Sequence, residues 1–116
     1  MSSRPLVALV LTVLALPSAA EDRTYHRVTV AQVATTKWTH VQVEGTVDYV
    51  ATEDDGDLHF RIADGGATVV CEIVPYHPLP RPHVGDRVRV SGITRYDKAH
   101  RWAEIHPVEQ LDPLHQ

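Results

Sequence analysis

A period-two alternation of apolar and polar residues constrains this chain more than any other feature. Successive side chains of a strand point to opposite faces, so the alternation between Trp38 and Thr52 predicts a half-buried β-strand. The inward face is expected to carry Val41, Val43, Gly45, Val47 and Tyr49. A glycine inside such a run, here Gly45, predicts a bulge or a sharp coil of the strand.

Four further segments show the same alternation, over residues 57–64, 68–74, 86–93 and 102–111. Glu53–Gly56 and Asp64–Gly66, at the two ends of the first of these segments, are typical of hairpin turns. Four prolines between Pro75 and Pro82 exclude a regular helix or strand there and predict a stiff, extended loop. Five short strands, the first long and coiled, with this loop between the third and the fourth, predict an all-β, five-stranded OB-fold barrel.

The N-terminal residues have the pattern of a secretory signal peptide. A positively charged start, an apolar run over residues 6–16 and small residues before Glu21 predict cleavage after Ala20. A membrane span needs about 20 apolar residues, so we expect no span after cleavage and a periplasmic or secreted product. The predicted organisation is a signal peptide (1–20), an N-terminal extension (21–37), an OB-fold domain (38–111) and a tail (112–116). Within the extension, Thr29 is expected to cap a short helix over residues 30–34.

The charge balance disfavours nucleic acid as a partner. The chain has 11 basic and 15 acidic residues and a formal net charge of −4, which loss of Arg4 with the signal peptide would make more negative. This is the wrong sign for attraction to phosphate backbones. Cys71, the only cysteine in the sequence, alternates with Val69 and Ile73, so we expect a buried thiol that acts as a small apolar side chain.

The order of several short segments resembles the exported bacterial OB-fold proteins of the BOF type. The resemblance rests on Thr29–Gln32, Val43–Val47, Phe60–Asp64, Glu72–Ile73 and Asp86–Gly92. The later Asp-x-x-His-x-Trp-x-Glu-Ile-His-Pro segment, residues 97–107, is similar to that of uncharacterised secreted OB-like domains. The resemblance implies export and a barrel, but OB barrels host many unrelated ligands, so it implies no particular function.

The candidate site follows from which polar residues share the outward face of the second, third and fifth strands. The expected ligand-binding residues are His59, Arg61, Glu72, Trp102, Glu104 and His106. Imidazoles and carboxylates together suit zinc or another divalent transition metal, and the candidate metal ligands are His59, His100, Glu104 and His106. The chain has no H-E-x-x-H or C-x-x-C motif, so the ligand of this face stays open between a protein, a saccharide, a small solute and a metal ion. In a purely structural alternative, Trp102 and His106 only brace the barrel surface.

Two other functions are weighed against a non-catalytic binding module. A metal-dependent hydrolase or nuclease would use the same histidines and carboxylates, with His100 or His106 beside Asp97 or Glu104 as an acid–base pair. No nucleophile is evident, and we assign no catalytic residue. Single-stranded nucleic-acid binding would need aromatic platforms on the second and third strands, and their outward faces carry none. The acidic turn Glu53–Asp57 is interpreted as a solvated hairpin rather than a calcium loop.

Overall fold

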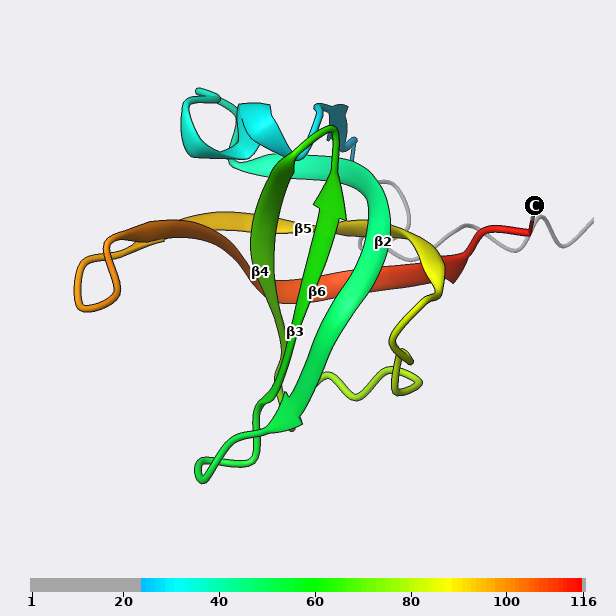
Figure 1. The fold of residues 1–116 in the computed structure, drawn as a ribbon. Coiled ribbons are helices and arrows are strands. Elements are labelled where there is room, and N and C mark those ends of the chain that lie inside the picture. Colours follow the sequence, from blue (N-terminus) through cyan, green and yellow to red (C-terminus); the bar gives the residue numbers. More distant parts are fainter. Residues whose placement is uncertain (1–23, 116) are drawn as a thin grey trace, which may run out of the picture.

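Five strands form a closed barrel in the computed structural model, which describes residues 24–115 (Figure 1). The barrel strands are β2 (His40–Thr52), β3 (Leu58–Asp64), β4 (Ala67–Ile73), β5 (Arg87–Asp97) and β6 (Trp102–Pro113). The predicted signal peptide lies outside the described residues. Within them, no helix has both the length and the apolar character that crossing a membrane requires.

The strand order confirms the predicted fold class. Neighbouring strands follow the order β2-β3-β4-β6-β5, and a further pairing of β5 with β2 closes the barrel. All of these pairings are antiparallel except that of β4 with β6, which is parallel. This is the arrangement of a five-stranded OB-fold barrel.

Strand β2 belongs to both halves of the barrel, because its first half pairs with β5 and its second half with β3. Gly45 lies where the strand coils between these partners. A Cβ added there would lie 3.1 Å from both the Cβ of Ile62 and the carbonyl oxygen of Ala63, so a glycine permits the close approach. The coil predicted at this position is therefore present.

The inward position predicted for Tyr49 is wrong. The register of β2 against β3 shifts between Val47 and Tyr49, and an extra residue in one strand reverses which face the following side chains occupy. Tyr49 is consequently 46% exposed, and Val50 packs against the core instead. The alternation of the sequence continues smoothly through this point, so it gave no sign of the bulge.

The core fills the barrel with the inward residues that the alternation predicts. Fully buried members include Val41, Val43, Phe60, Ile62, Val90, Ile105 and Val108. Cys71 lies among them, as expected, and burial raises the pKa of its thiol well above the ordinary range. A short 3-10 helix, η1 (Ala31–Ala34), adds Val33 at one end of the barrel. Thr29, which precedes this helix, and Gln32 within it exchange side-chain-to-backbone hydrogen bonds of 2.9 and 3.2 Å, as a capping box does.

One element was not predicted. Within the N-terminal extension, β1 (His26–Arg27) pairs in parallel with Val41 and Gln42 of β2. β1 adopts strand geometry because β2 supplies its hydrogen-bonding groups. Two residues are too few to show the period-two alternation of a strand. Tertiary pairing therefore decides its conformation.

The connections between strands set the shape of the barrel surface. Residues 74–86, which link β4 to β5, contain neither helix nor strand, as the prolines predict. Strand β5 continues past the predicted Ile93 to Asp97, so β5 and β6 form a long hairpin. In Figure 1 this hairpin projects to the left and the β2–β3 turn to the lower left, so both extend beyond the barrel.

Candidate ligand-binding site

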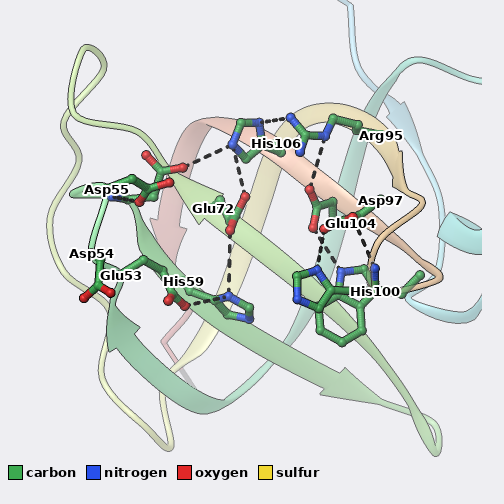
Figure 2. A pocket seen from close by; sticks show the side chains of 12 residues that line it. Glu53, Asp54, Asp55, His59, Glu72, Arg95, Asp97, His100, Glu104 and His106 are labelled. Carbon is green, nitrogen blue, oxygen red and sulfur yellow. Dashed lines mark hydrogen bonds and ion pairs between the residues drawn. The ribbon is translucent and has the colours of Figure 1, made fainter.

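An acidic hollow of about 640 Å³ lies between the β2–β3 turn and the β5–β6 hairpin (Figure 2). Its lining comprises Glu53, Asp54, Asp55, Asp57, His59, Glu72, Arg95, Asp97, His100, Trp102, Glu104 and His106. Among the described residues this lining has seven carboxylates, three imidazoles and one guanidinium. The hollow therefore has a strong excess of negative groups.

The register of three strands brings polar side chains of the hollow into one row. His59 of β3 is paired directly with Glu72 of β4. The parallel pairing of β4 with β6 aligns Cys71 with Ile105, so the next step along both strands places Glu72 beside His106. Each of these residues lies on the outward face by strand alternation, but only the register makes them neighbours.

Asp57, Glu72 and His106 converge on one point, and we call them the donor triad. Nε2 of His106 lies 3.0 Å from Oε2 of Glu72 and 3.3 Å from Oδ2 of Asp57. One donor atom from each of the three residues lies within 4.8 Å of the other two. On the far side of the ring, Arg95 approaches Nδ1 of His106 at 3.4 Å, which fits a neutral imidazole whose proton is on Nε2.

Glu72 is the centre of this network. Nδ1 of His59 lies 3.7 Å from its Oε1 and 3.1 Å from Oε1 of Glu53. Burial raises the pKa of Glu72, and the negative charge of Glu104 raises it further, while the histidines oppose the shift. A positive charge arriving beside Glu72 would remove this electrostatic penalty.

Glu104 points outward from β6 and is nevertheless only 2% exposed (Figure 2). Its Oε2 accepts a hydrogen bond of 3.0 Å from Nε1 of Trp102. Its Oε1 has no hydrogen-bond partner among the described residues, although Nε of Arg95 lies 3.3 Å away as an ion-pair partner. A buried carboxylate oxygen without a hydrogen bond is costly, so this group favours a positively charged or hydrogen-bonding ligand.

A second pair, Asp97 and His100, forms the wall of the hollow at the β5–β6 turn. Oδ2 of Asp97 lies 2.7 Å from Nδ1 of His100, and Oδ1 accepts the backbone N–H groups of Ala99 and His100. The hydrogen bond to His100 lowers the pKa of Asp97, and the same bond raises the pKa of His100. The ring of His100 stacks on Trp102 with centroids 4.6 Å apart.

The structure brings most of the predicted ligand-binding residues together. Those that line the hollow are His59, Glu72, Trp102, Glu104 and His106. Arg61 is not among them, because its guanidinium pairs with Asp48 at 2.7 Å on the neighbouring strand.

The predicted metal set of His59, His100, Glu104 and His106 is not the set that converges. Of these four predicted ligands, only His106 belongs to the donor triad. His100 is held by Asp97, and Glu104 is held by Trp102. The interpretation of Glu53–Asp57 as a solvated hairpin missed Asp57, whose side chain turns into the hollow. Its place two residues before His59, on the same outward face, was the available signal.

Comparisons with known proteins find no matching family model and no matching curated protein. Among solved structures, the chain is similar to asparaginyl-tRNA synthetase from Pyrococcus horikoshii, with a TM-score of 0.65 and 18% identity over 78% of this chain and 23% of that one. This is an OB-fold protein. The present chain thus spans less than a quarter of the synthetase.

Two further solved structures match the barrel over most of their own length. A chain of a replication protein A heterotrimer bound to ssDNA gives a TM-score of 0.65 and 12% identity, over 81% of this chain and 84% of that one. The hypothetical protein ygiW from E. coli gives a TM-score of 0.58 and 19% identity, over 77% of this chain and 90% of that one. At such identities the likeness shows the fold alone.

Proposed function

We propose that the protein is an exported, non-catalytic OB-fold module that binds a cationic ligand in the acidic hollow. The observation that carries this proposal is where the hollow lies. OB folds bind their ligands on the face of their second and third strands and in the loops that follow the first and fourth. In this chain these are β3, β4 and the turns at Glu53–Asp57 and Lys98–Arg101, and the hollow lies among them.

The charge of the hollow defines the ligand class. Seven carboxylates against one guanidinium repel anionic ligands and attract cations. An amine-bearing saccharide, a basic protein segment, a small organic cation or a metal ion each fits this requirement. A phosphate-rich single strand does not fit it, and one face of Trp102, an aromatic surface available to a base, is already covered by His100.

Export is supported by the residues of the N-terminus. The apolar run over residues 6–16, the positive start and the small residues before Glu21 have the signal-peptide pattern. The resemblance to exported BOF-type proteins is consistent with it. We propose that the mature protein acts in the periplasm or outside the cell.

A ligand panel tests the cation-binding function. The untagged protein is followed by thermal unfolding with spermidine, a chitosan oligomer and Zn²⁺, and with N-acetylated chitooligosaccharides and a single-stranded oligonucleotide as neutral and anionic counterparts. We expect at least one of the cations, and neither counterpart, to raise the unfolding midpoint, because a ligand that binds only the folded state stabilises it. Added salt should weaken binding of an organic cation.

Matched variants locate the response. Glu104→Gln removes a buried negative charge from the hollow. Glu44→Gln removes a negative charge outside the hollow, where Glu44 of β2 pairs with Arg89 of β5. The first should abolish most of the cation-induced shift and the second should preserve it. Preferential binding of the oligonucleotide or of the neutral saccharide, unchanged in Glu104→Gln, would contradict the proposal.

The second candidate function is a metal-dependent hydrolase or nuclease. The pairing of Asp97 with His100 at 2.7 Å favours it, because a carboxylate that orients an imidazole is a common acid–base arrangement. This function predicts turnover of an ester or phosphodiester substrate in the presence of a divalent metal, with turnover lost in His100→Ala. Absence of turnover across both substrate classes would leave the binding function.

A further inference from the structure

We propose that the donor triad of Asp57, Glu72 and His106 binds a divalent first-row transition-metal ion. This inference rests on the proposed cation-binding function and identifies the class of the cation. It also assigns the ligands to residues that come from three separate elements: the β2–β3 turn, β4 and β6.

The spacing of the donor atoms fits a metal. Ligands about 2.1 Å from a tetrahedral ion lie about 3.4 Å from one another. The two distances from Nε2 of His106, 3.0 Å to Glu72 and 3.3 Å to Asp57, are close to this separation. Small movements of half-buried side chains are thus enough to place an ion among them.

An independent observation points to a cation in the same hollow. Glu104 lines the hollow, is 2% exposed and has one carboxylate oxygen without a hydrogen bond among the described residues. The charge of Glu104 acts on that of Glu72, and Arg95 is the ion-pair partner of Glu104. A divalent ion at the donor triad would offset the remaining negative charge.

The donor set selects the class of metal. One imidazole nitrogen and two carboxylate groups fall short of the six to eight oxygens that Ca²⁺ takes, and Mg²⁺ prefers oxygen ligands throughout. Imidazole suits zinc, copper, nickel and iron. Three protein ligands leave a coordination position open toward the hollow, as in sites where a metal also holds water or a second ligand.

The surrounding side chains have roles that follow from their contacts. His59, 3.7 Å from Oε1 of Glu72, would hold that carboxylate in place as an outer contact of the site. Arg95 would oppose the metal. A metal on Nε2 of His106 requires the neutral ring to carry its one proton on Nδ1 instead, where Arg95 now approaches as a donor. Arg95 is about half exposed and free to swing away from the ring.

The test is titration of the untagged full-length protein with Zn²⁺ by calorimetry, and with Co²⁺ by visible absorption. We expect one equivalent of Zn²⁺, and Co²⁺ d–d bands that Zn²⁺ displaces. Asp57→Asn, Glu72→Gln and His106→Gln should each weaken Zn²⁺ binding by more than about tenfold, since even outer-shell substitutions cost tenfold or more. Mg²⁺ and Ca²⁺ should bind more than about tenfold more weakly than Zn²⁺.

Two matched controls lie outside the hollow. Asp48→Asn removes a carboxylate that pairs with Arg61, and His83→Gln removes an imidazole 3.6 Å from Asp86. Both should leave Zn²⁺ affinity unchanged. Circular dichroism and thermal unfolding without metal establish which variants fold. The Zn²⁺ affinities of the folded variants decide the outcome.

Three results would overturn the inference. Wild-type affinity in the triad variants would place the metal elsewhere, and equal affinity for Mg²⁺ would remove the transition-metal class. If the wild-type protein binds no Zn²⁺ while spermidine still stabilises it through Glu104, the metal inference fails and the cation-binding function stands. If neither kind of cation binds, both fail.

Discussion

The indole N–H of Trp102 donates a 3.0 Å hydrogen bond to Glu104, two residues farther along the same face of β6. The bond holds one oxygen of a buried carboxylate and leaves the other, which faces Arg95, without a hydrogen bond among the described residues. Because His100 stacks on the same indole, the β5–β6 turn and the floor of the hollow are joined through one side chain. Trp102 is thus a positioning residue for the site.

Trp102→Phe should destabilise the protein by about 1–3 kcal/mol, because it leaves the buried carboxylate of Glu104 short of a donor. Urea unfolding measures the change. The double-mutant cycle with Glu104→Leu, which has no acceptor for the indole N–H, isolates the hydrogen bond from the loss of ring area. A cost for Trp102→Phe that is the same in both backgrounds would show that the bond contributes nothing.

Arg95→Gln should strengthen Zn²⁺ binding and weaken the fold. The guanidinium lies 3.4 Å from Nδ1 of His106, so its removal takes away a repulsion that is worth about tenfold for a divalent ion at about 6 Å in a water-like medium. The same change removes the ion-pair partner of Glu104 and should cost about 1–2 kcal/mol. Calorimetry and urea unfolding measure the two effects.

Arg89→Gln is the matched control for this prediction, because Arg89 pairs with Glu44 outside the hollow. It should leave Zn²⁺ affinity unchanged. Weaker Zn²⁺ binding in Arg95→Gln would mean that Arg95 helps to assemble the site rather than opposing the ion.

The Asp97–His100 pair should give a defined pH dependence. Its hydrogen bond raises the pKa of His100 above the ordinary value of about 6.5 and lowers that of Asp97 below about 3.9, and the charges of Glu104 and Glu72 raise the pKa of His100 further. The stability from His100 is fully present below pH about 6.5 and is lost as pH rises through its folded pKa. The stability that Asp97 contributes is present above pH about 3.9 and is lost as pH falls through the folded pKa of Asp97.

NMR titration of the histidine ring protons measures this directly. In Asp97→Asn the His100 resonance should titrate at lower pH than in the wild type. The difference in unfolding free energy between the two proteins should be largest between pH about 4 and 6.5. An unchanged His100 titration in Asp97→Asn would show that the pair does not form in solution.

The fold was predictable because it depends on local pattern. Alternation identifies the inward residues of a strand without knowledge of its partners, and turn residues bound the strands, so Phe60, Ile62 and Cys71 were placed correctly. Tyr49 was misplaced because its orientation depends on a bulge in the pairing with β3. A sequence pattern carries no information about that pairing.

The site was predictable only in part, for the same reason. Alternation places Glu72 and His106 on the outer face, but the parallel register of β4 and β6 is what makes them neighbours. His100, which was predicted as a fellow metal ligand, is instead held at the β5–β6 turn by Asp97. Asp57 enters the site because it directly precedes β3 and its side chain turns into the hollow, and turn chemistry alone does not predict this.

Gly92 links the fold to the site, and Gly92→Ala should impair both. A Cβ at this position would lie 2.5 Å from the carbonyl oxygen of Pro107 and 2.6 Å from Cγ2 of Ile105. Both neighbours flank His106 on β6, so the strand must move to accept the methyl group. We expect a loss of about 3 kcal/mol in urea unfolding and weaker Zn²⁺ binding, because the ring of His106 moves with its backbone.

Gly65→Ala provides the comparison, since nothing lies within 4 Å of a Cβ there and only its positive φ of 57° opposes the substitution. It should cost about 1–2 kcal/mol and leave Zn²⁺ affinity intact. If Gly92→Ala costs no more than Gly65→Ala and binds Zn²⁺ normally, then β6 adapts to the methyl group without displacing His106. The close contact of β5 with β6 would then have no part in positioning the donor triad.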